Sequence, residues 1–147
     1  MPEVFKIGIT KNNNQEIQEV KEISLSAGKG IIGDRYYHEY NKDRNQLTLI
    51  ESENIDYYNE KFDLKIPYLN FRRNIVTKGI KLNVLVSKKL IIGETELRVV
   101  DLCRPCKSLQ KNLAQNNIIK EFLRKGGLRC EILTSGNVKA GDEIKIP

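Results

Sequence analysis

Short apolar segments separated by turn-forming residues occur along the whole chain, and this pattern constrains the fold more than any other feature of the sequence. Strand-like alternation or clustering of apolar residues is found in segments 4–9, 47–50, 90–99, 128–132 and 144–146. Clusters of glycine and asparagine lie between these segments. Short strands bounded by such turns are typical of barrels and bent sheets. The pattern therefore predicts a mainly β fold, either a β-barrel or a strongly bent sheet.

Two segments between the strands have the spacing of helices instead. Ser52 is a candidate N-cap for a helix that carries Ile55 and Tyr58 on one face. Apolar residues recur with helical spacing across 108–125, and the glycine pair at 126–127 would end that helix. Because strands and helices do not alternate along the chain, the pattern excludes a doubly wound α/β sheet. We expect a few peripheral helices around the β-structure.

Two other segments are less regular. Residues 14–25 fit an extended segment, although three apolar residues spaced by three within it also fit a helix. Residues 72–77 resemble a strand that enters a turn at Gly79. Residues 28–35 hold three glycines and predict an irregular loop whose backbone approaches another group closely.

Length and composition indicate one ordinary globular domain over residues 1–147. Hydrophobic residues make up 39% and charged residues 30% of the 147 positions. The chain has no apolar run near the roughly 20 residues that span a bilayer, and its first residues do not resemble a secretory signal. We therefore expect a cytoplasmic protein without a membrane partner.

The net charge of +6 favours anionic partners in general. The basic residues are scattered, with no long block and no basic stripe rich in aromatic residues. A solvated, lysine-rich surface explains most of them. We therefore expect no nucleic-acid partner, and a phosphorylated cofactor or an acidic protein remains open.

The segment Cys103-Arg104-Pro105-Cys106 holds two of the three cysteines. Secreted disulfide scaffolds usually carry more cysteines in even number, so free thiols, metal ligation or redox chemistry explain this usage better. Thiolates bind soft metals and attack electrophiles, and neighbouring cations such as Arg104 and Lys107 favour the thiolate. Cys106 also precedes a predicted helix, and a helix N-terminus favours negative charge.

Three other interpretations of the cysteine pair stay open from chemistry alone. A structural zinc site needs four ligands, and the chain offers three cysteines and one histidine, His38. A thioredoxin-like redox pair lacks the βαβ context. Two unrelated buried cysteines are the third interpretation. His38 has no neighbours in sequence that mark it as a ligand or a general base.

Two arginine-containing segments are candidate anion sites. In the glycine-rich loop, exposed amides and Arg35 fit a phosphate or carboxylate, but the glycine spacing matches no known phosphate loop. Arg72 and Arg73 offer planar guanidinium groups that match phosphate oxygens, and Asn74 offers both a donor and an acceptor. A tight turn and an exposed strand edge are the ordinary alternatives for the two segments.

Taken together and in order, these segments resemble the MOSC domain, a family named after the C-terminal part of molybdenum cofactor sulfurases. The likeness covers nearly the whole chain. The segments that carry it are 30–35, 46–50, 72–83, 102–106, 126–133 and 136–144.

The resemblance implies a β-barrel fold and an essential cysteine, here Cys106, that ligates molybdenum or carries a sulfane sulfur. It also implies that Arg35, Arg72, Arg73 and Asn74 face the phosphate of a molybdenum–pterin cofactor or the metal. One departure is Tyr36, because many relatives have histidine directly after the Gly-Asp-Arg motif. The chain has no recognisable pyridoxal phosphate site and no domain for electron delivery.

The resemblance leaves two functional hypotheses. In the first, Cys106 ligates the molybdenum of the cofactor, and the protein reduces N-hydroxylated compounds with electrons from an electron-transfer partner. In the second, Cys106 carries a persulfide received from a cysteine desulfurase, and Cys103 resolves it. The chain is thus either a molybdenum-dependent oxidoreductase or a sulfur-transfer component. A third hypothesis, outside the family, is a small β-barrel that binds nucleic acid or protein through its positive charge.

Overall fold

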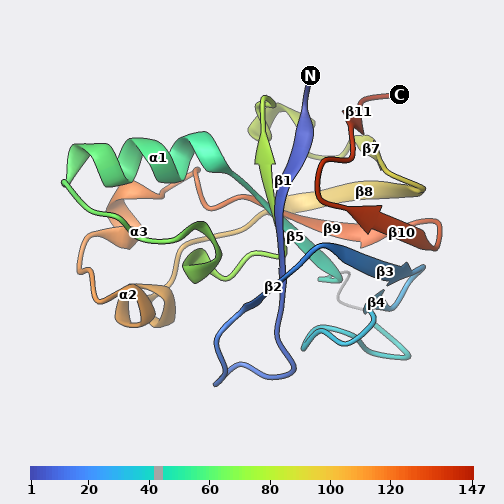
Figure 1. The fold of residues 1–147 in the computed structure, drawn as a ribbon, viewed down its shortest axis with the longest axis horizontal. Helices are drawn as coiled ribbons and strands as arrows, with labels where there is room; N and C mark the ends of the chain where they lie inside the picture. The colour runs from blue at the N-terminus through green and yellow to red at the C-terminus, as the bar shows by residue number, and fades with distance from the viewer. Residues whose placement is uncertain (42–44) are drawn as a thin grey trace.

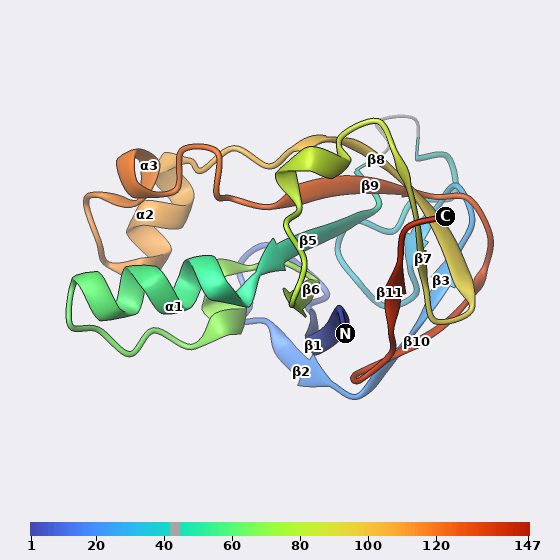
Figure 2. The same cartoon turned by 90° about the horizontal axis from the view of Figure 1, so that it is seen from above.

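The chain folds into a curled β-structure with helices gathered at one end (Figures 1 and 2). The computed structural model describes residues 1–41 and 45–147. The strands are β1 (Glu3–Ile9), β2 (Gln18–Val20), β3 (Glu22–Ser26), β4 (Gly30–Ile31), β5 (Leu47–Glu51), β6 (Ile75–Lys78), β7 (Lys89–Ile92), β8 (Thr95–Leu102), β9 (Leu128–Ile132), β10 (Gly136–Lys139) and β11 (Ile144–Lys145). The helices are α1 (Ser52–Lys61), α2 (Lys107–Leu113) and α3 (Ile118–Glu121), with short 3₁₀ turns η1 (Tyr68–Phe71) and η2 (Asn83–Leu85).

Eight strands form one sheet in the order β11-β7-β8-β9-β5-β6-β1-β2, and β10-β3-β4 form a second sheet. The mainly β prediction is confirmed, but the sheet is a curled half-barrel and not a closed barrel. The start of β1 meets the segment before β11 through one isolated bridge, between Glu3 and Glu143. Backbone hydrogen bonds accompany this bridge, from the Val4 N–H to the Asp142 carbonyl at 2.8 Å and from the Ile144 N–H to the Pro2 carbonyl at 2.9 Å. Further along β1, the same edge pairs with β2 at residues 7–9 instead. The strongly bent sheet is therefore the correct description.

Two apolar cores stabilise the fold. The first lies within the curl and draws side chains from most strands, such as Ile7, Leu49 and Cys130. The second lies under the helices, where the rings of Tyr58, Phe71 and Phe122 pack at centroid distances of 4.9–6.5 Å. The apolar faces of the helices cover the second core. Because Leu109 and Leu113 of α2 pack there, this core holds the segment from β8 into α2 in place.

The helical prediction for residues 108–125 was only partly right, because the structure has two short helices there. Ala114 takes a left-handed conformation with φ of 55° and ends α2. The Gln110 side chain then accepts a hydrogen bond from the Ile119 backbone N–H at 2.9 Å, which fixes the turn into α3. The break turns the chain back over the second core.

Of three further local predictions, the structure confirms the extended segment and corrects the other two. Ser52 is the first buried residue of α1 and not its N-cap, which is Glu51. Residues 14–25 are extended where the structure assigns strands, as β2 and β3. The predicted strand over 72–77 begins only at Ile75, because Arg72 ends η1 in a left-handed conformation with φ of 63°.

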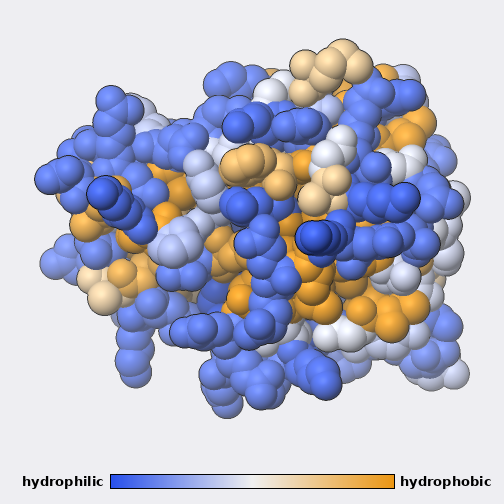
Figure 3. All heavy atoms as spheres, viewed as in Figure 1, coloured by the Kyte–Doolittle hydropathy of each residue, from blue (hydrophilic) through white to orange (hydrophobic). Residues whose placement is uncertain are grey.

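The surface is mainly hydrophilic on the face seen in Figure 3, with hydrophobic atoms visible between the charged side chains over the middle of the sheet. In the described part of the chain, no helix combines the length and apolar character that crossing a bilayer requires.

Candidate functional site

A hollow of about 410 Å³ lies where the loop after β1, the loop after β4, the junction of η1 with β6 and the start of α2 meet. It brings together four of the five predicted site residues: Arg35, Arg72, Arg73 and Cys106. The remaining lining residues are Asn13, Asn14, Tyr36, Ser108, Leu109 and Asn112. A thiol and three guanidinium groups therefore share one cavity, although they come from three separate parts of the sequence.

Arg35 is the most deeply placed cation of the hollow, with a side chain only 5% exposed. Asp34 positions it: one carboxylate oxygen accepts a hydrogen bond from the Thr10 N–H at 3.1 Å, and the Arg35 N–H donates to the Thr10 carbonyl at 2.7 Å. The guanidinium donates through Nη2 to the Arg72 carbonyl at 3.1 Å, and its Nη1 lies 3.5 Å from Asp34.

The guanidinium of Arg35 keeps unused donors. Nε and Nη1 are buried and have no hydrogen-bond partner among the described residues. The ring of Tyr36 lies against the same group, 4.3 Å from Cζ to the ring centroid. A buried donor without a partner costs free energy. An anion in the hollow would reach these two donors only after a shift of the neighbouring side chains, because both atoms are covered.

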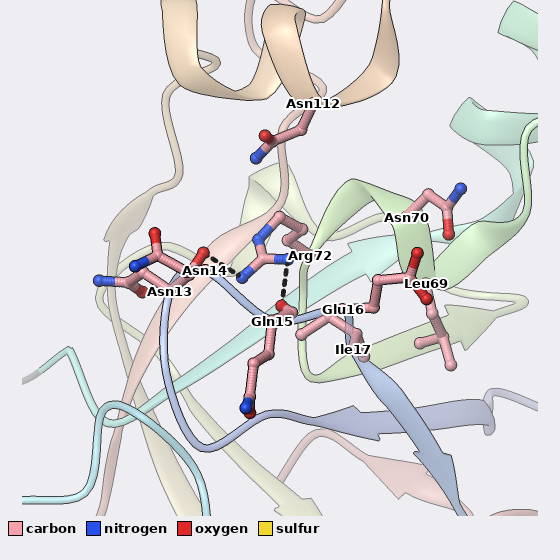
Figure 4. Close-up of a pocket in the computed structure, with 9 residues that line it drawn as sticks. All are labelled: Asn13, Asn14, Gln15, Glu16, Ile17, Leu69, Asn70, Arg72 and Asn112. Atoms are coloured by element: carbon pink, nitrogen blue, oxygen red, sulfur yellow. Dashed lines mark hydrogen bonds between the residues drawn. The ribbon is translucent and has the colours of Figure 1, made fainter.

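The Arg72 guanidinium already has hydrogen-bond partners within the protein. It donates to the carbonyls of Gln15 at 2.9 Å and Asn13 at 3.1 Å, and thereby holds the loop after β1 (Figure 4). Burial lowers the pKa of Arg72, and the nearby charge of Arg35 adds to this effect. Two guanidinium groups so close together repel each other, and an anion between them would relieve that repulsion.

Arg73 connects the hollow to the end of the α3–β9 segment. Its Nε donates to the Gly126 carbonyl at 2.8 Å. A side chain at Gly126 would overlap the Cys103 carbonyl oxygen, so glycine allows this close approach. Cys103 in turn donates its N–H to the Gly127 carbonyl at 2.8 Å. These contacts fix the backbone from which Cys106 extends.

Cys106 is the N-cap residue of α2, as its position before a predicted helix suggested, and it is exposed in the wall of the hollow. Cys103 and Cys130 are both buried. Burial raises the pKa of the Cys103 thiol, and Arg73 and Arg129 partly oppose the shift. Burial also raises the pKa of Cys130 far above the range of an ordinary thiol. Cys106 is thus the accessible thiol of the three.

The zinc interpretation finds no ligand set. Over residues 1–41 and 45–147, no three or more His, Cys, Asp or Glu side chains gather at one point. His38 is exposed and does not line the hollow.

Asn74 does not join the other predicted residues. It is fully buried, where its Oδ1 accepts hydrogen bonds from the N–H and hydroxyl of Thr48 at 3.1 Å each. Its Nδ2 donates to the Gly8 carbonyl at 3.2 Å. Asn74 therefore ties β1, β5 and β6 together beneath the site and positions the two arginines before it.

Sequence reasoning missed the asparagines of the hollow. Asn13 and Asn14 stand in a segment that the sequence predicts only as a turn, and no sequence pattern singles out Asn112. These residues also line a neighbouring hollow of about 320 Å³. In Figure 4, Asn112 of α2 faces Arg72 across that hollow. The two hollows share Asn13, Asn14, Arg72 and Asn112, so they form adjoining compartments.

Comparison with known proteins places the chain in a family. The model of the MOSC domain matches residues 34–145. The chain belongs to the MOSC family. The resemblance inferred from the sequence motifs is therefore confirmed, and the family is associated with the molybdenum cofactor. The match begins at Asp34, so the loop after β1 that lines both hollows lies outside it.

Solved structures of similar fold include the YuaD protein from Bacillus subtilis, with 18% identity, a TM-score of 0.84, and coverage of 98% of this chain and 94% of that one. YiiM from Geobacillus stearothermophilus has 14% identity and a TM-score of 0.81, over 100% of this chain and 75% of that one. YiiM from Escherichia coli has 20% identity and a TM-score of 0.73, over 99% and 68% of the two chains. At these identities the likeness concerns the fold. No curated protein matches this chain in sequence.

Proposed function

We propose that this MOSC protein binds a molybdenum–pterin cofactor in the hollow, with the Cys106 sulfur as the protein ligand of the metal. One observation supports this most: the accessible thiol of Cys106 and the side chain of Arg35 line the same cavity. A thiolate suits a soft metal, and guanidinium groups suit phosphate oxygens.

The residues of the hollow fit both parts of such a cofactor. Nε and Nη1 of Arg35 are covered donors without hydrogen-bond partners among the described residues, and a phosphate that displaced the neighbouring side chains would provide acceptors. Arg73 adds positive charge beside Cys106. Arg72 holds the loop after β1 and so shapes the wall between the two hollows.

The proposed reaction is the reduction of N-hydroxylated compounds. Two electrons and two protons cleave the N–O bond, so that an N–H group and one water molecule are formed. When bound, the cofactor would supply a two-electron redox centre. The chain holds Cys106 and the arginines in place for it, and the electrons come from a partner protein.

Molybdenum content tests the proposal. The protein and its Cys106→Ser variant are produced in a host that makes the cofactor, and metal is measured by mass spectrometry. We expect molybdenum near one atom per chain in the wild type and a large loss in the variant. Cys130→Ser is the matched control, because that buried thiol faces the first core. Equal molybdenum in wild type and Cys106→Ser would contradict the proposal.

The alternative function is sulfur transfer with a persulfide on Cys106. The exposure of this thiol favours it, since a carrier must meet its donor. Cys103 is a poor resolving thiol, because it is buried and its raised pKa disfavours the thiolate. Incubation with a cysteine desulfurase and cysteine should add the mass of one sulfur atom to Cys106. Failure of Cys106 to gain that mass would remove this alternative.

A further inference from the structure

A second basic surface lies apart from the Cys106 hollow. A groove of about 390 Å³ runs between the start of α1, η2 and the segment that joins α3 to β9. Its lining residues are Glu51, Asn54, Lys81, Asn83, Val84, Leu123, Arg124 and Lys125. We call this surface the η2 groove. None of the predicted site residues lines it.

The η2 groove combines exposed apolar side chains with positive charge. Val84 and Leu123 are 66% and 67% exposed, although both are large aliphatic residues. Tyr57, 53% exposed, lies beside the groove, with the Lys125 ammonium 4.5 Å from its ring centroid. An exposed apolar patch with a polar rim is the usual anatomy of a protein-binding surface.

The charge of the groove is mainly positive. Lys81 and Arg124 are exposed, and Lys125 is partly exposed. Glu51 is the one acidic residue among the described residues that line the groove. It is buried, and its carboxylate accepts a hydrogen bond from the Leu82 N–H at 3.2 Å. The groove therefore presents cations to solvent and keeps its acidic group inside. Such a surface complements an acidic protein.

Residues 124–127 run from the groove to the backbone that contacts Arg73 and Cys103 beside the Cys106 hollow. The Asn83 side chain donates to the Arg124 carbonyl at the groove end of this segment. At the other end, Gly126 accepts from Arg73 at 2.8 Å, and Gly127 accepts from Cys103 at 2.8 Å. A protein bound in the groove would thus lie next to the segment that supports the site.

We propose that the η2 groove docks a small acidic electron-carrier protein that supplies the electrons of the proposed reaction, an inference that rests on the proposed function. Each turnover then oxidises two molecules of a one-electron carrier, and the protons come from water. The small groove suits such a partner, since electron-transfer encounters bury little surface, often below about 1,200 Å².

The test uses an acidic [2Fe–2S] ferredoxin as the electron donor and benzamidoxime as the substrate. In the groove variant, Lys81→Glu is combined with Arg124→Glu. In the matched control, Lys21→Glu is combined with Lys139→Glu, two exposed lysines outside the groove that give the same change in net charge. Turnover is also driven by reduced methyl viologen, which needs no docking surface.

We expect the groove variant to raise the KM for ferredoxin by about tenfold, because like charges then oppose the carrier. The control should stay within about twofold of the wild type. Both should keep the molybdenum content and the viologen-driven rate. Leu123→Asp, which changes an exposed side chain, should raise the same KM without altering the viologen-driven rate.

Two outcomes overturn the inference in distinguishable ways. If viologen-driven turnover is intact and the groove variant behaves like the control towards ferredoxin, the docking proposal alone is wrong. If the wild type holds no molybdenum and reduces no benzamidoxime with viologen, the proposed function fails and the docking proposal fails with it.

Discussion

The Cys106 hollow and the η2 groove are both basic, but they differ in how their cations are placed. In the hollow, Arg35 is almost fully buried beside Asp34, and two of its nitrogens have no hydrogen-bond partner in the described part of the chain. In the groove, Lys81 and Arg124 are exposed to water beside exposed aliphatic side chains. A buried guanidinium with some donors unpaired favours a small anionic ligand, whereas solvated cations around an apolar patch favour a protein partner. Two basic surfaces on one molecule thus predict two kinds of ligand.

The largest expected effect comes from residues 124–127, which run from the η2 groove to the backbone beside the Cys106 hollow. Gly127 has φ of 99°, and a β-carbon there would overlap the Leu49 carbonyl oxygen. We expect Gly127→Ala to lower the free energy of unfolding by about 3 kcal/mol, since it adds strain and a clash with backbone. Urea denaturation followed by circular dichroism measures this loss. A variant as stable as the wild type would contradict the close approach of Gly127 to the Leu49 carbonyl.

The next effect separates the two regions directly. Arg35→Lys keeps the charge but removes the planar fork, and we expect molybdenum occupancy to fall by about tenfold. Arg124→Lys is the matched change in the groove, where only charge is needed, and it should leave occupancy unchanged. Metal analysis of both purified variants checks this. Equal occupancy in the two variants would contradict the distinction between a buried and a solvated cation.

A smaller effect is expected at Arg72. Arg72→Lys removes the paired hydrogen bonds to the Asn13 and Gln15 carbonyls, and each such bond contributes about 1 kcal/mol. The loss should be local, because the loop after β1 is exposed. Hydrogen exchange should therefore accelerate in residues 11–16 and stay unchanged in β9. Unchanged exchange in the loop would show that Arg72 does not hold it.

The smallest effect is expected at the buried thiols. Burial raises the pKa values of Cys103 and Cys130, so both stay protonated at a pH where an ordinary thiol begins to ionise. Iodoacetamide should therefore modify neither thiol of the native protein as the pH rises from about 7 to 9, while all three react in urea. Mass spectrometry of alkylated peptides measures this, and native labelling of Cys130 would contradict the burial of this thiol.

Local patterns predicted much of the fold. The alternation in β9, for example, gives the burial seen there, with Leu128, Cys130 and Ile132 inside. The sequence could not predict whether the sheet closes, because closure depends on how β1 divides one edge between β2 and the segment before β11. Nor could it predict the break after α2, where a Gln110 side chain replaces backbone hydrogen bonding.

The arginines and the cysteine of the hollow could be predicted from the sequence, whereas its asparagines could not. Arg35, Arg73 and Cys106 stood out because their side chains carry distinctive chemistry. Asn74 is also polar and follows the two arginines in sequence. Its side-chain amide, however, is hydrogen-bonded to Thr48 and to the Gly8 carbonyl in the core. Asn112 gave no signal, since an asparagine on a helix surface is ordinary until another loop folds over it. The sequence could not show that Nε and Nη1 of Arg35 lack partners among the described residues, because that depends on which groups fold around the side chain.

The reactivity of Cys106 with and without the cofactor tests the central claim most directly. Protein from a host that makes the molybdenum–pterin cofactor is compared with protein from a host that cannot, and both are treated briefly with iodoacetamide at pH 8. We expect Cys106 to be alkylated readily in the cofactor-free protein and much more slowly in the loaded protein, because the metal occupies its sulfur. Equal rates of Cys106 alkylation in the two preparations would contradict the claim.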